Sequence, residues 1–187
     1  LGGWPEASLP VRACIADLER AYAENGAAFR AEALALLEAR GYEAHEGLQD
    51  PAKPKWSYAD VDDSTLEVSR PTIDRAVAAV RRTCGLQAAG ISRLEPGAAI
   101  RPHTGPTNRR WTLHLGLVVD AADVDRLTLT VAGTARAGAW VQGKVVLFDD
   151  SYEHDVVHAG ARDRVVLDLS VDHPSFFLRG GGSGGEL

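Results

Sequence analysis

Cysteine and methionine are nearly absent from this sequence: its 187 residues include two cysteines, Cys14 and Cys84, and no methionine. The cysteines lie far apart in the chain and form no short-spaced pair of the kind that binds zinc or attaches haem. A disulfide framework is therefore not expected. We predict two unpaired thiols, as in a protein of the reducing cytoplasm.

Blocks of basic residues are missing as well. The net charge is −6, and the arginine pairs in "VRRTCG" and "NRRW" stand alone. Because binding to nucleic acid needs a patch of cations that neutralises phosphates, we expect no nucleic-acid partner. No apolar run reaches the ~20 residues of a membrane-spanning helix, and residues 1–25 lack the apolar core of a signal peptide. We expect no membrane partner either, and the composition leaves the oligomeric state open.

The first half of the chain has the periodicity of helices. Apolar residues recur at three- and four-residue spacing over 8–26 and 27–41, and again over 69–85, where Ser69 is a candidate N-cap. The segment 49–64 is polar and interrupted by prolines, which predicts a loop. These elements form a predicted N-terminal helical part, 1–85, that packs on the rest of a single domain.

From residue 86 onward the period changes from helical to alternating. Short β-branched runs, separated by Gly, Asp and Pro, follow one another without intervening helices. The runs are "LQAAGISRL", "RRWTLHLGLVV", "RLTLTVAG", "GKVVLFDD", "HDVVHAG" and "DRVVLDLSVD". The pattern predicts a mainly β fold with N-terminal helices, in which 86–178 forms a sandwich or jelly-roll barrel. The glycine-rich segment 179–187 is predicted to be a flexible tail.

The strand "RRWTLHLGL" has one polar and one apolar face. Alternation places Arg110, Thr112 and His114 on one side, and Trp111, Leu113 and Leu115 on the other. The apolar side belongs in a core. The polar side either lines a pocket or meets solvent, and this segment taken alone favours solvent, because exposed polar faces are common in antiparallel sheets.

The last predicted strand, "RVVLDLSV" (164–171), alternates in the same way. Its four odd-numbered residues are all aliphatic. The other face presents Arg164, Val166, Asp168 and Ser170, which could line a wet pocket or face solvent. Periodicity does not choose between the two.

Two histidines are candidate metal ligands. His103 precedes a Gly-Pro turn, and His154 follows the acidic turn "DDSYE" after an apolar strand. Two imidazoles with open positions suit non-haem Fe(II), which also needs room for substrate and oxygen. The usual carboxylate two residues after the first histidine is missing, because that position is Gly105. Spacing alone therefore gives iron only weak support.

The segment "HDVVH" (154–158) offers a competing zinc pattern, since it resembles the HExxH of zinc proteases. That pattern requires a helix, whereas this segment has the composition of a strand, on which positions i and i+4 lie roughly 13 Å apart. We reject the zinc site. His158 is predicted to be a surface or turn residue, and His45 and His173 to be structural.

Two long segments together resemble a known family. "RPHTGPTNRRWTLHLGLVV" and "GKVVLFDDSYEHDVVHAGARDRVVLDLSVDHP" are similar to the aspartyl/asparaginyl β-hydroxylases, which are Fe(II)- and 2-oxoglutarate-dependent dioxygenases on a double-stranded β-helix of the jelly-roll or cupin type. The resemblance covers residues 90–174. The family shares the glycine at position 105, so the missing carboxylate becomes one of its signatures.

The resemblance implies a role for each matching residue. His103 and His154 would be the two iron ligands. Arg164, helped by Ser92, would hold the distal carboxylate of 2-oxoglutarate, because arginine is permanently charged and binds carboxylates through two parallel hydrogen bonds. The remaining matches are His114, in the cosubstrate pocket, and Arg110, at the substrate.

The resemblance also implies a reaction. With 2-oxoglutarate and O2 as cosubstrates, the enzyme would hydroxylate a C–H bond, in first place the β-carbon of an Asp- or Asn-like residue in a peptide or amino-acid derivative. Thr112 stands where the family usually has a second arginine, which leaves the substrate open. The alternatives are another oxidative outcome, such as halogenation or desaturation, another amino-acid substrate, or an inactive jelly-roll binding module.

Overall fold

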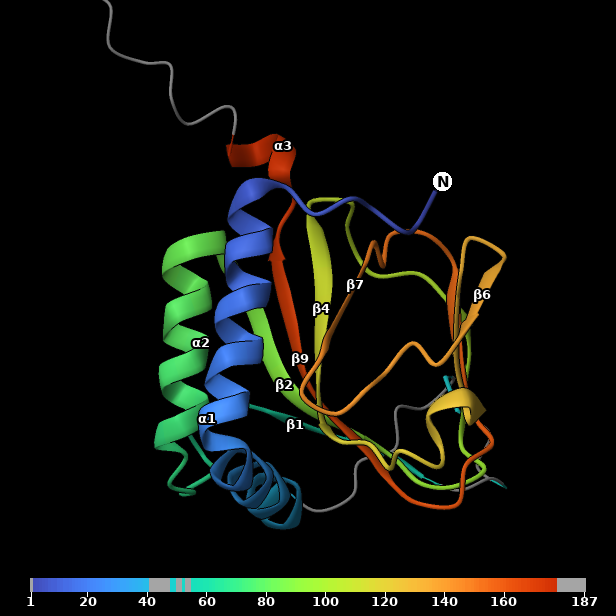
Figure 1. Cartoon of the computed structure of the whole chain (residues 1–187), viewed down its shortest axis with the longest axis horizontal. Helices are drawn as coiled ribbons and strands as arrows, with labels where there is room; N and C mark the ends of the chain where they lie inside the picture. Colours follow the sequence, from blue (N-terminus) through green and yellow to red (C-terminus); the bar gives the residue numbers. More distant parts are fainter. Residues whose placement is uncertain (1, 41–47, 50–51, 53–54, 178–187) are drawn as a thin grey trace, which may run out of the picture.

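The structure is a computed structural model that describes residues 2–40, 48–49, 52 and 55–177 (Figure 1). Two long helices stand beside a barrel of strands, and a short helix follows the last strand. The elements are α1 Leu9–Arg40, β1 Trp56–Asp60, α2 Pro71–Cys84, β2 Leu86–Leu94, β3 Ala99–His103, β4 Arg110–Val118, η1 Val124–Arg126, β5 Leu127–Val131, β6 Thr134–Ala137, β7 Val145–Phe148, β8 His154–His158, β9 Arg164–Asp172 and α3 Pro174–Phe177.

The strands form two facing antiparallel sheets. One has the order β1-β2-β9-β4-β7, and the other has the order β3-β8-β5-β6. Helices α1 and α2 lie together against the outer face of the five-stranded sheet (Figure 1). This is the predicted mainly β jelly-roll barrel with N-terminal helices. No helix among the described residues is long and apolar enough to cross a membrane.

The alternation along β4 and β9 divides the molecule into a core and a pocket. Odd-numbered residues of both strands, such as Leu113 and Leu167, are fully buried in the core between the five-stranded sheet and the helices. The even-numbered polar residues point the opposite way, into the barrel. The interpretation that the polar face of β4 meets solvent is therefore wrong, because the second sheet covers that face.

The two expected helices, 8–26 and 27–41, are present: they share the label α1 and meet at a kink at Asn25, which has a non-helical backbone conformation. The helical part differs from prediction at two points. Ser69 does not cap α2; instead the Glu32 carboxylate of α1 accepts hydrogen bonds from the amides of Thr72 and Ile73 at the start of α2. The predicted loop 49–64 contains strand β1, whose short alternation the flanking prolines concealed.

The prediction of two unpaired thiols is wrong. Cys14 of α1 and Cys84 at the end of α2 form a disulfide, with their Cα atoms 6.7 Å apart. The pair joins the two helices, because the fold brings their ends together regardless of sequence separation. The cytoplasmic location was inferred from unpaired thiols and stays a prediction, which the redox state of this pair in cells would test. His45 and the tail 179–187 lie outside the described residues.

His158 is not a surface residue as predicted but is 1% exposed, at the end of β8. Its Nε2 lies 2.7 Å from the carbonyl oxygen of Arg162, and the amide of Gly160 donates to its Nδ1. Both ring nitrogens thus have partners when the ring is neutral. Burial lowers the pKa of His158 below 6.5, against the opposing effect of the hydrogen bond to Arg162.

This lowered pKa predicts a loss of stability in acid. Below pH ~6.5 an unfolded chain protonates His158 while the folded chain resists, so the free energy of unfolding falls as the pH falls. We expect urea unfolding between pH 7.5 and 5.5 to show a shallower decline for His158→Gln, since glutamine offers a donor and an acceptor but does not titrate. An equal decline in both proteins would contradict the assignment.

Candidate active site

A cavity of about 380 Å³ lies inside the barrel, between the two sheets. Its wall combines residues of β1, β2, β4 and β9 with residues of β3 and β8 on the facing sheet. The lining residues include all six that the sequence singled out: Ser92, His103, Arg110, His114, His154 and Arg164. One cavity therefore gathers residues spread over 73 positions of the chain, Ser92 to Arg164.

His103 and His154 lie side by side because β3 and β8 are paired. The two residues are direct partners in the strand register, and their ring centroids are 4.1 Å apart. The register is irregular between Ile100 and His103, which marks a bulge just before the first histidine. Strand pairing thus brings together two residues that are 51 positions apart.

In each of these two histidines the Nδ1 atom has a hydrogen-bond partner, and the Nε2 atom is free to bind a metal. The Nδ1 atom of His103 lies 2.8 Å from the carbonyl oxygen of Arg101, and the Nδ1 of His154 lies 3.0 Å from that of Tyr152. A carbonyl only accepts, so each Nδ1 carries the proton and each Nε2 keeps its lone pair. Burial lowers the pKa of His154, assisted by the neighbouring His103, which favours the neutral form that binds metals.

Asp150 occupies the space that the side chain of a third ligand, a carboxylate at position 105, would need. A Cβ atom added at Gly105 would collide with the Asp150 carboxylate. Asp150 is buried, and its Oδ2 accepts two hydrogen bonds from Arg110, at 3.2 Å from Nε and 2.8 Å from Nη2. Among the described residues, no group of three or more His, Cys, Asp or Glu side chains is arranged to hold a metal. A metal in this cavity would therefore have the two histidines as its protein ligands.

Arg164 is the most deeply buried cation of the cavity, with 1% of its surface exposed. Its Nη2 donates to the hydroxyl of Ser92 at 3.0 Å, whereas Nε and Nη1 have no partner. Burial lowers the pKa of Arg164 to about 9, against the opposing charge of Asp168, so the group is protonated at neutral pH. Buried charges without partners are costly, and this one is suited to receive an anion.

His114 lies on β4, which pairs with β9, the strand that carries Arg164. Its Nε2 lies 3.4 Å from Oδ1 of Asp168, its strand partner on β9. Its Nδ1 accepts a hydrogen bond from the indole of Trp140 at 3.2 Å. Phe148 lies edge-on between the rings of His114 and His154, at centroid distances of 5.1 and 5.4 Å.

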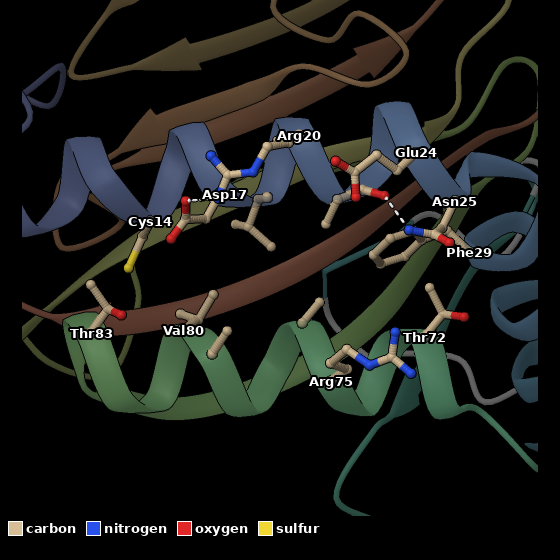
Figure 2. A pocket seen from close by; sticks show the side chains of 14 residues that line it. Cys14, Asp17, Arg20, Glu24, Asn25, Phe29, Thr72, Arg75, Val80 and Thr83 are labelled. Carbon is tan, nitrogen blue, oxygen red and sulfur yellow. Dashed lines mark hydrogen bonds and ion pairs between the residues drawn. The ribbon is translucent and has the colours of Figure 1, made fainter.

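A second hollow, of about 260 Å³, lies between α1 and α2 and has a different character (Figure 2). Figure 2 shows apolar side chains such as Val80 and Phe29 at its floor and charged ones at its rim, where Arg20 donates to Asp17. None of its lining side chains has a buried polar atom without a partner. The barrel cavity holds three such atoms, two on Arg164 and one on Asp150, so it is the candidate site.

Sequence reasoning missed three residues that line the cavity, Trp56 and Tyr58 of β1 and Asp150, and it missed Trp140, which contacts His114 and Arg164. Trp56 donates from its indole to the hydroxyl of Ser92 at 3.1 Å, and Tyr58 fills the space above Gly90. The pattern "KWSYADV" alternates and could have revealed β1. Trp140 lies in a glycine-rich loop with no periodicity, and no local pattern distinguishes Asp150 from its acidic neighbours.

This chain matches a known family. The family described as "Aspartyl/Asparaginyl beta-hydroxylase" matches residues 23–174. The aspartyl/asparaginyl beta-hydroxylase of Mus musculus is 40% identical over 83 residues, which are 44% of this chain and 10% of that protein. An ornithine lipid ester-linked acyl 2-hydroxylase of Rhizobium tropici is 40% identical over 90 residues, 48% of this chain and 31% of that protein. The matched parts are thus a tenth to a third of these relatives.

Solved structures share the fold at low sequence identity. A prolyl-4-hydroxylase of Pseudomonas putida has a TM-score of 0.51 and 19% identity over 85% of this chain and 99% of that one. AviO1 of Streptomyces viridochromogenes has a TM-score of 0.57 and 14% identity over 86% of this chain and 96% of that one. At these identities the likeness supports the double-stranded β-helix and nothing finer.

Proposed function

Because this chain belongs to the aspartyl/asparaginyl β-hydroxylase family, we propose that it is an Fe(II)- and 2-oxoglutarate-dependent oxygenase that hydroxylates a C–H bond. One observation carries the proposal. The buried, partly unpartnered guanidinium of Arg164 lines the same cavity as the two imidazoles whose Nε2 atoms are free. To bind an oxo-acid to iron, a site needs a cation that holds the distal carboxylate and side chains that hold the metal. This cavity has both.

His103 and His154 would hold the metal through Nε2. Their Nδ1–H groups donate to backbone carbonyls, which fixes both rings and raises the basicity of the free nitrogens. Neutral imidazoles leave the charge of Fe(II) intact, and with it the Lewis acidity that polarises bound oxygens. When bound, Fe(II) and 2-oxoglutarate supply the activation of O2, which puts one oxygen atom into the substrate and the other into succinate, with release of CO2.

Arg164, Ser92 and His114 would hold the cosubstrate. Arg164 has two free positions for a carboxylate, and Ser92 shares its hydroxyl between Arg164 and Trp56, which fixes that side of the pocket. His114 presents its Nε2 to the cavity beside Asp168. Because these groups are buried at the bottom of a barrel, the bound cosubstrate would be shielded from bulk water.

Arg110 would meet the substrate nearer the mouth of the cavity. Asp150 holds its Nε and Nη2, so Nη1 is the position left for a substrate carboxylate. The first substrate that we propose is an Asp- or Asn-like residue in a peptide or amino-acid derivative, hydroxylated at the β-carbon. Thr112, where the family usually has another arginine, lies buried in the wall and offers only a hydroxyl.

An anaerobic titration followed by an oxygen-dependent assay tests the proposal. Fe(II) and then 2-oxoglutarate are added without O2, and succinate is measured after O2 is admitted with Asp- and Asn-containing peptides, free amino acids or an ornithine lipid. The last compound is included because the name of one relative specifies it. A product heavier by one oxygen supports the hydroxylase. Binding of both compounds without any turnover would indicate the inactive module instead.

The mass of the product also separates hydroxylation from the other oxidative outcomes. We expect a gain of one oxygen whether or not chloride is present. A gain of chlorine that depends on chloride would identify a halogenase, and a loss of two hydrogens a desaturase. Either result would overturn the hydroxylase while keeping the metal and cosubstrate assignments.

Arg164→Lys is expected to weaken 2-oxoglutarate binding tenfold or more. Lysine keeps the charge but loses the planar fork, whose charge-assisted hydrogen bonds contribute ~1.5–3 kcal/mol. Titration of the Fe(II) protein measures the change, and the affinity for Fe(II) itself should stay the same. Arg162→Lys is the matched control, since that side chain is 76% exposed on the surface. Normal cosubstrate binding by Arg164→Lys would refute this role of Arg164.

A further inference from the structure

Trp140 is a buried residue of the barrel that no metal, cosubstrate or substrate assignment uses. It lies in the loop between β6 and β7 and is 1% exposed, packed with Phe148 and Val166 in the core between the two sheets. Its indole nonetheless contacts both His114 and Arg164, two of the residues proposed to hold 2-oxoglutarate. The two contacts use different parts of the ring.

The edge of the indole determines which nitrogen of His114 carries the proton. The N–H of Trp140 points to Nδ1 of His114 at 3.2 Å. An indole N–H can only donate, so Nδ1 must accept, and the proton of the neutral ring lies on Nε2. That nitrogen is the one beside Asp168, on the side of the cavity. Trp140 thus places the N–H of the imidazole beside Asp168, and both of these side chains line the cavity.

The face of the same indole lies against Arg164. The guanidinium carbon is 4.7 Å from the centroid of the Trp140 ring. An aromatic face stabilises a cation most where water is excluded, and this guanidinium is fully enclosed. The contact leaves Nε and Nη1 of Arg164 unpartnered, and Nη2 on Ser92. Trp140 therefore supports the cation from the side without occupying its carboxylate-binding positions.

We infer that Trp140 is a positioning residue for the carboxylates of the cosubstrate: it fixes the Nε2–H tautomer of His114 with its edge and the guanidinium of Arg164 with its face. The inference rests on the proposed function, because it needs 2-oxoglutarate as the ligand of these two residues. It adds a residue from outside both sheets to the site. A tryptophan that only fills the core would need neither the hydrogen bond to His114 nor the cation–π contact with Arg164.

Trp111 provides a matched control for the packing contribution. It is also a buried tryptophan, 7% exposed, but it lies on the opposite face of the five-stranded sheet. Its Nε1 has no hydrogen-bond partner, and its ring packs against His173. Trp111→Phe therefore removes the same atoms as Trp140→Phe from a core position without touching the cavity.

The first measurement is titration of 2-oxoglutarate into the anaerobic Fe(II) protein. Loss of the hydrogen bond and weakening of the cation–π contact should lower the affinity of Trp140→Phe about tenfold. Trp111→Phe should bind like the wild type. Affinity for Fe(II) should be the same in all three proteins, because neither tryptophan contacts His103 or His154 in the part of the chain that the structure describes.

The second measurement is the tautomer of His114 by nitrogen-15 NMR at mildly alkaline pH, which needs neither metal nor activity. The wild type and Trp111→Phe should show the Nε2–H form. Trp140→Phe should show a larger share of the Nδ1–H form, because only the more distant Asp168 carboxylate, at 3.4 Å, then favours Nε2–H. A wild-type His114 with its proton on Nδ1 would overturn the inference even if Trp140→Phe did not fold.

The outcomes of the two measurements separate this inference from the proposed function. Wild-type protein that binds 2-oxoglutarate, with Trp140→Phe equal to Trp111→Phe in affinity, overturns the role of Trp140 alone. Wild-type protein that binds Fe(II) but no 2-oxoglutarate overturns the proposed function and the inference together. A tenfold loss confined to Trp140→Phe, with a changed tautomer, supports both.

Discussion

His103→Ala and His154→Ala are each expected to abolish turnover and to remove most of the affinity for Fe(II). Each variant would delete one of the two proposed protein ligands, and no third His, Cys, Asp or Glu in the described part of the chain is arranged to replace it. The barrel should stay folded, because both side chains end in the cavity and are not part of either apolar core.

Fe(II) titration and the succinate assay measure these losses, and circular dichroism reports the fold. His173→Ala is the matched control, since that histidine follows β9 and does not line the cavity. It should bind Fe(II) like the wild type. Succinate production by either ligand variant at the wild-type rate would refute the assignment of the metal site.

Removal of the disulfide should have the largest effect on stability. The bond closes a loop with a sequence separation of 70, and its loss releases chain entropy in the unfolded state worth about 4 kcal/mol. We expect Cys14→Ser with Cys84→Ser to lower the free energy of urea unfolding by about this amount. The wild type should lose the same amount under dithiothreitol, whereas the double variant should not respond to it.

The affinity of the double variant for Fe(II) should remain unchanged, because the disulfide lies on the helix side of the five-stranded sheet. A double variant as stable as the wild type would show that the bond adds nothing to the fold. Thiol labelling in intact cells is a separate measurement. It would test whether Cys14 and Cys84 are bonded there, and so whether the cytoplasmic location that we predicted is compatible with this bond.

The sequence predicted the strands well where alternation was long. The nine residues of β2, Leu86–Leu94, were delimited correctly, and the split of β4 and β9 into two faces is the one that the structure has. Local pattern did not reveal what covers the polar face of His114. A polar strand face has the same alternating sequence whether it meets solvent or a pocket covered by a second sheet. Only the resemblance to a family therefore favoured a pocket.

Long-range pairing explains the remaining errors. The Cys14–Cys84 bond depends on how α1 packs against α2, and the burial of His158 depends on the loop that returns to it at Arg162. Neither contact has a local signature. The His103–His154 register pair is equally remote in sequence. Spacing alone supported a shared site only weakly, and the resemblance to a family linked the two segments.

Along β4 and β9, successive residues alternate between the core and the cavity. One side chain, such as Leu113, packs in the core between the sheet and the helices, and the next, His114, lines the cavity. Substitutions at the first kind should lower the amount of folded protein, and those at the second should leave a folded protein without activity. A deletion of one codon would exchange the two sets and lose both at once, so this part of the gene tolerates replacement far better than it tolerates a change of length.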